Sequence, residues 1–316
     1  MTSLAAFSRP RKLRVLLFPI LTLVGLSGGT AGQKSDAQLL ILAVPSGKIE
    51  VTLPDEQLSI ARDDILAWIK TAARTVSTYY GRFPVPHLTL RVRTDDRSGV
   101  HRGVTYAKDG GLILISVGRD TSLDALKDDW TLTHEMVHLA FPSMGDNHHW
   151  IEEGISTYVE PVARAQAGGL PVDEVWRQFI RDMPKGQPQY GDHGLDNTPT
   201  WGRTYWGGAM FCLLADVRIR ERTHNRKGLQ DALRAIRNHG GVISQDWDLE
   251  KALAIGDKAT GTKVLQELYA ELRDKPSPVD LDELWKKLGL ALDGRDVHYD
   301  DQAPEAAIRK AITARK

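Results

Sequence analysis

The residues of this chain best suited to chemistry are two histidines and a glutamate in the run Thr-His-Glu-Met-Val-His, residues 133–138. His134 and His138 stand four positions apart, so on a helix both imidazoles project from one face and can share a metal ion. Glu135 lies beside them, placed to accept a proton from a metal-activated water. Such a run also arises by chance, and the alternative interpretation is a surface helix with two incidental histidines.

A third ligand is expected from the segment that follows. A hydrolytic zinc site normally has three protein ligands and one open position for water, so two histidines leave the ion one ligand short. The run Trp-Ile-Glu-Glu-Gly, residues 150–154, offers Glu153 near the start of a second helix. A third histidine of the HExxHxxGxxH type is excluded, because Phe141 and Met144 stand where that motif requires glycine and histidine. The sequence therefore predicts a site of two histidines and one glutamate.

Both segments have the apolar periodicity of helices that bury one face. The stripe of the first helix is Leu132, Met136, Leu139 and Ala140, and that of the second is Ile151, Ile155, Tyr158, Val159 and Val162. The candidate ligands lie off these stripes. We therefore expect each helix to pack its apolar face into a core and to present its ligands to a cleft.

These runs together resemble the gluzincin zinc metallopeptidases and are similar to the aminopeptidase-N-like group and the related glycyl aminopeptidases. In that group the third ligand is the glutamate of a Glu-Gly pair, which here is Glu153 followed by Gly154. A second block, Thr-Tyr-Trp-Gly-Gly-Ala at 204–209, is similar to the group's Tyr-x-Lys-Gly-Ala helix, whose tyrosine stabilises the transition state. The resemblance covers residues 99–241 and implies this role for Tyr205, the alternative being an aromatic residue packed at a helix start. Gly207 stands where the group has lysine.

The resemblance implies an α+β fold of the thermolysin or gluzincin type, with a small mixed-sheet lobe followed by a mainly helical catalytic lobe. We expect an N-terminal α/β lobe at 36–118, a helical zinc-binding lobe at 119–241 and a C-terminal helical segment at 242–316. In the first lobe, the patterns predict strands at 39–44, 49–53, 87–92, 103–107 and 112–117, and a helix at 60–80. Farther along, they predict helices at 122–140, 149–167, 172–182, 203–223, 228–238, 260–274, 280–288 and 303–314.

Other polar residues have two interpretations each. The irregular segment 184–201 has the length of a functional lid, and its Asp192 and His193 are either extra ligands or parts of a solvated loop. Glu160 either orients a ligand histidine through its free N–H or lies on a solvated helix surface. The adjacent His148 and His149 are ordinary polar residues of a helix start and are left out of the site. The single cysteine, Cys212, lies in an apolar run and is expected to be a buried small hydrophobe.

Composition and the N-terminal segment indicate where the protein works. The chain of 316 residues has 41 basic and 41 acidic residues, which gives no electrostatic footprint for nucleic acid. Residues 1–35 carry basic residues at positions 9–14, then an apolar run at 15–26 and small residues. That run is shorter than the roughly 20 residues of a transmembrane helix. This pattern is typical of a cleaved secretory signal, with an uncleaved anchor as the alternative. We expect an exported protein, periplasmic or secreted, without stable membrane insertion after cleavage.

The expected function is a zinc metallopeptidase with one Zn2+ per chain and a peptide or protein substrate, although cobalt or manganese could replace the zinc. Aminopeptidases of the resembling group hold the substrate's free amine with the glutamate of a Gly-x-Met-Glu-Asn strand. The comparable run, Gly-Val-Thr-Tyr-Ala-Lys at 103–108, has no carboxylate, and Asp109 comes next at a glycine-rich turn. Endopeptidase action is therefore expected. One alternative is an aminopeptidase of the same clan. The other is a catalytically silent scaffold protein of the cell envelope, and such a scaffold would have no need of Glu135.

Overall fold

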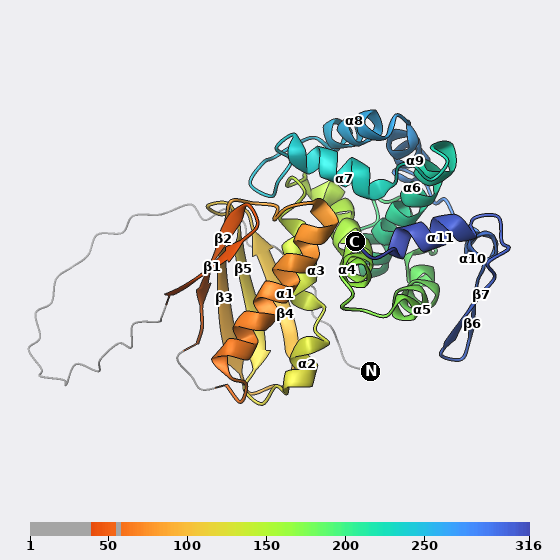
Figure 1. Ribbon diagram of the computed structural model, residues 1–316. Coiled ribbons are helices and arrows are strands. Elements are labelled where there is room, and N and C mark those ends of the chain that lie inside the picture. Colours follow the sequence, from red (N-terminus) through yellow and green to blue (C-terminus); the bar gives the residue numbers. More distant parts are fainter. Residues whose placement is uncertain (1–38, 55–57) are drawn as a thin grey trace, which may run out of the picture. The chain divides into compact units, whose positions relative to one another are not determined.

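A five-stranded mixed sheet begins the part of the chain that the computed structural model describes, residues 39–54 and 58–316. Its strand order is β1-β2-β3-β5-β4, and Figure 1 shows it beside the helices. Two predicted strands, β1 (Leu39–Val44) and β2 (Gly47–Thr52), form an antiparallel hairpin. Strands β2, β3 (His87–Asp95) and β5 (Leu112–Gly118) run parallel. β4 (Val100–Tyr106) pairs antiparallel with β5 and is an edge strand. The predicted signal peptide, 1–35, lies outside the described residues.

One face of the sheet is buried, and the other is accessible and carries both polar and apolar side chains, among them the exposed Leu39 and Ile41 of β1. Along β3, Leu88, Leu90 and Val92 are buried while Arg91 and Arg93 are exposed, the alternation of a strand with one buried face. Helix α1 (Arg62–Tyr80) lies across the sheet (Figure 1). One side of this predicted helix is buried throughout: Ile65, Trp68, Ile69, Ala72 and Val76. The sheet and α1 therefore share one core.

From residue 122 onward the described chain is mainly helical, as predicted. The helices are α2 (Leu123–Lys127), α3 (Thr131–His138), α4 (His149–Gln166), α5 (Val172–Asp182), α6 (Gly208–Arg222), α7 (Leu229–Asn238), α8 (Leu249–Thr260), α9 (Val264–Leu272), α10 (Leu281–Leu288) and α11 (Ala306–Thr313). Short 3-10 turns at Asp146–His148 and Met183–Gly186 and a π-helix at Gly202–Gly207 join them. No helix in the described part is both long enough and apolar enough to span a membrane. The α+β class is confirmed.

The structure differs from the predicted elements in several places. The single helix expected at 122–140 is two, α2 and α3, because Asp129 accepts hydrogen bonds from the N–H groups of Thr131 and Leu132 and starts a new helix. Helix α8 was missed, and the helix predicted at 260–274 begins only after Gly261, which ends α8 with φ 71°. The segment 242–316 also contains a hairpin, β6 (Leu290–Asp293) and β7 (Asp296–Tyr299).

The helices are tied to the sheet layer at the C-terminal end of α1. This end has free carbonyl groups and no basic residue of its own in its last turn. Gln230 and Arg234 of α7 donate to the Tyr79 carbonyl at 2.7 and 2.6 Å, and Arg237 donates to the Tyr80 carbonyl at 2.9 Å. Two cations thus lie at the negative end of the α1 dipole, which is favourable.

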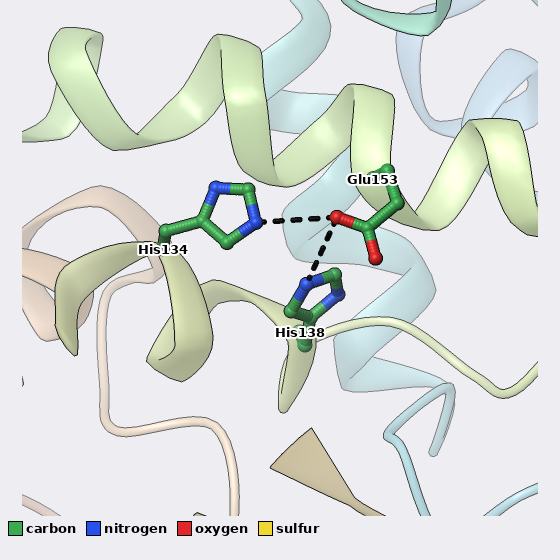
Figure 2. Close-up of side chains that lie close together, drawn as sticks. All are labelled: His134, His138 and Glu153. Atoms are coloured by element: carbon green, nitrogen blue, oxygen red, sulfur yellow. Dashed lines mark hydrogen bonds and ion pairs between the residues drawn. The ribbon is translucent and has the colours of Figure 1, made fainter. Parts of the chain in front are cut away.

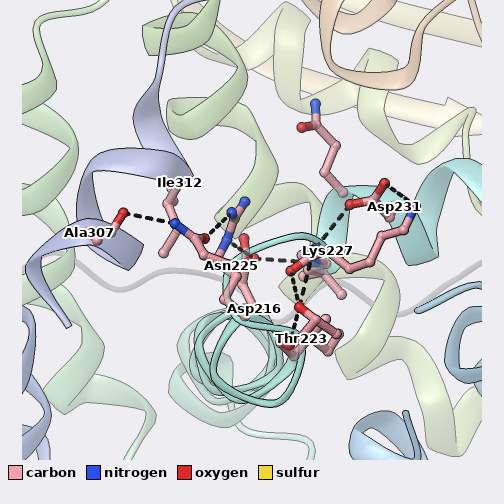
Figure 3. A network of polar contacts seen from close by, with 12 residues as sticks. Asp216, Thr223, Asn225, Lys227, Asp231, Ala307 and Ile312 are labelled. Atoms are coloured by element: carbon pink, nitrogen blue, oxygen red, sulfur yellow. Dashed lines mark hydrogen bonds and ion pairs between the residues drawn. The ribbon is translucent and has the colours of Figure 1, made fainter. Parts of the chain in front are cut away.

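A buried carboxylate joins three of the helices. Asp216 of α6 accepts hydrogen bonds from the Tyr158 hydroxyl of α4 at 2.8 Å and from the Leu229 N–H at the start of α7 at 3.0 Å. Nearby, the side chain of Asn225 donates to the carbonyl of Ala307 in α11 at 3.2 Å, and Figure 3 shows this contact. The bond from Tyr158 ties α4, the helix that carries Glu153, to α6.

Candidate metal centre and active site

Helices α3 and α4 bring His134, His138 and Glu153 together. The Nε2 atom of His134 lies 3.2 Å and that of His138 3.6 Å from Oε2 of Glu153, as Figure 2 shows. One ligand atom from each residue lies within 4.8 Å of the other two. The three side chains are between 7% and 13% exposed. Two imidazole nitrogens and one carboxylate oxygen converging in a buried position are a donor set that suits zinc.

The start of α3 is fixed by contacts with α1. Asp129, one residue before the N-cap Trp130, accepts hydrogen bonds from the first two N–H groups of α3 and one from the Trp68 indole of α1 at 3.2 Å. Burial raises the pKa of Asp129, while the hydrogen bonds that it accepts oppose this shift. Because His134 lies one turn into α3, this anchoring to α1 sets where its imidazole points.

A close approach of two backbones places α6 against α4 next to Glu153. A Cβ atom on Gly154 would lie 2.3 Å from the backbone carbon of Gly208, and one on Gly208 would lie 2.1 Å from the Trp150 carbonyl oxygen. Neither position can hold a larger residue at this separation. Gly208 and Gly154 therefore allow the close packing of α6 against α4.

The π-helix before α6 carries Tyr205. Its ring stacks on the His134 ring at a centroid distance of 6.4 Å and an interplanar angle of 20°. The pKa of the Tyr205 hydroxyl is raised, mainly by burial and further by the negative charges of Glu153 and Glu135. The hydroxyl therefore keeps its proton at neutral pH and can donate it in a hydrogen bond. Local π-helical geometry is frequent at functional sites.

Glu135 points to strand β4 rather than into solvent. The Thr105 hydroxyl donates to Oε2 of Glu135 at 2.5 Å, and a Cβ atom on Gly103 would lie 2.4 Å from Cγ of Glu135. The glutamate is 7% exposed. Its carboxylate is thus held between α3 and the edge strand, beside the cluster of His134, His138 and Glu153.

Charges within the cluster favour the ionised forms of its members. Burial disfavours ionisation of Glu153, yet the charge of His138 and hydrogen bonds from both histidines hold its pKa well below the usual range. Burial likewise opposes protonation of His138, but the Glu153 carboxylate outweighs it and raises the pKa of His138 to about 9. The metal-free protein therefore holds a proton that a bound cation would displace.

Sequence reasoning missed three residues that support the site. His149 lies with Nε2 3.3 Å from Oε1 of Glu153 and Nδ1 3.0 Å from Oε2 of Glu152. Glu152 also accepts a hydrogen bond from the Met144 N–H at 3.0 Å, which fixes the turn between α3 and α4. The spacing of four between His149 and Glu153 was the available signal. No pattern in the sequence pointed to Thr105, because its contact with Glu135 depends on sheet order.

The other polar residues that the sequence singled out are not members of the cluster of His134, His138 and Glu153. Asp192 is buried and its Oδ2 forms an ion pair with Nε of Arg203 at 2.8 Å, while His193 is exposed. Glu160 is 6% exposed, so the solvated interpretation is wrong, and its Oε1 accepts from Nη1 of Arg164 at 3.1 Å. Burial raises the pKa of Glu160 to about 7, with the Arg164 charge opposing. Cys212 is buried, as expected.

Comparison with solved structures places this fold among zinc metallopeptidases. The chain is similar to an aminopeptidase N family protein from Idiomarina loihiensis, with a TM-score of 0.61 and 12% identity over 81% of this chain and 50% of that one. It is also similar to a variant of a two-domain M1 zinc metallopeptidase bound to L-arginine, with a TM-score of 0.50 and 12% identity over 77% of this chain and 54% of the other.

The likeness to these structures is one of fold. The chain spans about half the length of each of them. No protein-family model matches the sequence. No curated protein matches it either. The part of the chain that the structure describes thus has the fold of aminopeptidase-N-family metallopeptidases, as the motif resemblance predicted.

Proposed function

We propose that this protein is a zinc-dependent metallopeptidase that hydrolyses peptide bonds. The observation that carries the proposal is the buried cluster of His134, His138 and Glu153, with Glu135 beside it and Tyr205 stacked on His134. These are the parts that hydrolysis by a metal-activated water requires, and they lie on the fold of known zinc metallopeptidases. One zinc ion per chain, held by the two imidazoles and the carboxylate, would complete the site.

In this mechanism the chain's own residues move one proton and stabilise one charge. Zinc, when bound, polarises the substrate carbonyl and acidifies water. Glu135 accepts the proton of the attacking water and returns it to the leaving amine, while Thr105 holds its carboxylate in place. Tyr205 donates a hydrogen bond to the developing oxyanion, a type of contact worth about 3 kcal/mol of barrier.

We further propose that the peptide lies along edge strand β4 and is cut internally. An edge strand can pair with an extended peptide by β-addition. The run 103–108, which covers the end of this strand and the two residues after it, carries no carboxylate to hold a free amine. Asp109 lies in the following turn with φ 49°. The same proposal includes two further points. The sheet lobe and the helical catalytic lobe are arranged as in the gluzincins, and the segment 1–35 directs export.

The alternative is an aminopeptidase, which the aminopeptidase N family membership of one structural neighbour favours. A matched pair of peptides, one N-acetylated and one free, separates the two modes when the products are identified by mass spectrometry. Internal cleavage of both peptides is expected. Stepwise loss of single residues from the free peptide alone would restore the aminopeptidase interpretation.

The chemical part of the proposal is tested with Glu135→Gln. The amide cannot accept a proton, so hydrolysis of an unfolded protein substrate should fall at least about 100-fold, within the range of general-base catalysis. Zinc content should stay at the wild-type value, because Glu135 is not one of the three ligands. Undiminished hydrolysis by this variant would remove Glu135 from the mechanism, and zinc-loaded wild-type protein without any hydrolysis would indicate a silent scaffold.

A further inference from the structure

Two tryptophans beside the site are exposed to an unusual degree for their size. The exposed fraction is 54% for Trp130 and 61% for Trp201. Large aromatic side chains usually bury most of their surface, so exposed ones near a functional site are informative. In the described chain, no hydrogen bond from either indole N–H is found, whereas Trp68 and Trp150 donate theirs to aspartates. Hydrogen bonds of the indole N–H groups therefore do not explain where Trp130 and Trp201 lie.

Both tryptophans lie directly against residues of the candidate site. The Trp130 ring meets the His134 ring edge to face at a centroid distance of 5.6 Å. The Trp201 ring stacks on the Tyr205 ring at 5.9 Å, and Tyr205 in turn stacks on His134 at 6.4 Å. Trp130, His134, Tyr205 and Trp201 form one continuous row of rings, which we call the aromatic row. Each end of this row is an exposed tryptophan.

The chemistry of the row selects its occupant. An exposed indole face binds either an apolar side chain or a cation. The Lys185 ammonium, which is paired with Asp182 at 2.7 Å, lies over the Trp201 ring at 5.9 Å from its centroid and already takes the place of a cation at that end. An aromatic or large aliphatic side chain meets no such competition and covers apolar surface that is otherwise hydrated.

We propose that the aromatic row binds a bulky apolar side chain of the peptide, next to the bond that is cleaved. This inference rests on the proposed peptidase function and gives it a substrate class. Trp130 and Trp201 form the binding surface, and neither takes part in proton transfer. Because they touch His134 and Tyr205, a side chain bound there holds the adjoining peptide bond at the site.

The test measures binding separately from turnover. Zinc-loaded Glu135→Gln protein is titrated in a calorimeter with three short glycine- and serine-rich peptides that differ at one central position, which is phenylalanine, alanine or lysine. The phenylalanine peptide should bind about tenfold more tightly than the alanine peptide, equivalent to about 1.4 kcal/mol. The lysine peptide should bind no better than the alanine peptide. Equal affinity for all three would overturn the proposal.

Variants then locate the preference. In the same Glu135→Gln protein, Trp201→Ala and Trp130→Ala should each reduce the difference in affinity between the phenylalanine and alanine peptides to about threefold or less. Each substitution removes one end of the apolar surface. Trp201→Phe should retain the preference. Tyr190→Ala is the control, because Tyr190 is fully exposed in the same irregular segment, and it should change nothing. A preference that survives both alanine substitutions would contradict the role of the row.

Zinc content and hydrolysis separate this inference from the function on which it rests. All tryptophan variants should retain zinc, so that a change in peptide preference reflects the binding surface. Preferential binding of phenylalanine without any cleavage by the wild-type enzyme would support the row and overturn the peptidase proposal. Cleavage without a preference for phenylalanine would support the peptidase proposal and overturn the role of the aromatic row. If the protein neither bound nor cleaved the peptides, both proposals would be overturned.

Discussion

At the scale of single residues, the glutamates around the site differ in their surroundings. Glu153 faces two imidazoles, which hold its pKa low. Glu135 accepts a hydrogen bond from the Thr105 hydroxyl. Glu160 is buried, and its partner Arg164 offsets only part of the desolvation, so its pKa rises to about 7. Under the proposed mechanism, one residue type would thus act as a ligand at 153, as a proton acceptor at 135 and as a buried acid at 160, according to what each carboxylate touches.

The raised pKa of Glu160 makes stability depend on pH. Between its ordinary pKa of 4.5 and about 7, the folded state binds a proton that the unfolded state has lost. The free energy of unfolding should therefore fall as the pH rises through this window, by about 3 kcal/mol. Glu160→Gln should remove the share of this fall that Glu160 contributes, whereas the share from His138 and Glu305, whose pKa values are also raised, should remain. Urea unfolding of metal-free protein at pH 5 and pH 8 measures it.

The control for this prediction is Glu250→Gln, which changes an exposed glutamate at the start of α8. It should show the same loss of stability between pH 5 and pH 8 as the wild type. If Glu160→Gln and the wild type lost stability equally over this range, Glu160 would not be the group responsible.

At the scale of elements, the site depends on how closely β4 approaches α3. No side chain fits at Gly103, because a Cβ atom there would overlap Glu135. Gly103→Ala should displace the Glu135 carboxylate, and a misplacement of about 1 Å costs about 100-fold in rate. Zinc content should be unchanged, since the three ligands lie on α3 and α4. Kinetics of peptide hydrolysis and metal analysis together test this.

Gly145→Ala is the matched control for Gly103→Ala. Gly145 has φ −63° and open space around its Cβ position, so the added methyl group should be tolerated. If both variants hydrolysed peptide at the wild-type rate, the contact between Gly103 and Glu135 would have no role in placing the carboxylate.

The sequence predicted the elements whose signal is local. The ligand cluster followed from spacing within α3 and α4, and the strands and α1 followed from apolar periodicity. The break before α3 was missed because the periodic pattern continues through Asp129, and only the capping bonds show the new start. The contact of Thr105 with Glu135 joins residues 30 positions apart, so no local pattern could predict it.

At the scale of the whole molecule, distant segments hold the site together. Helix α7 caps the end of α1, α1 anchors the start of α3 through Asp129, and Asp216 ties α4 to α6. A zinc ion would add a further connection between α3 and α4. Because the unfolded chain does not hold these ligands together, metal binding should stabilise the folded state, by about 2.7 kcal/mol at a free metal concentration of 100 times Kd.

The central claim is that His134, His138 and Glu153 hold one zinc ion. The direct measurement is zinc content after dialysis, with the thermal unfolding midpoint, for the wild type, Glu153→Ala and Glu152→Gln. Glutamine is chosen at 152 because its oxygen can still accept the Met144 hydrogen bond. Wild type and Glu152→Gln should retain one zinc per chain and unfold at a lower temperature after chelation, whereas Glu153→Ala should lose the metal and show no such change. Equal zinc retention by Glu153→Ala and Glu152→Gln would contradict the claim.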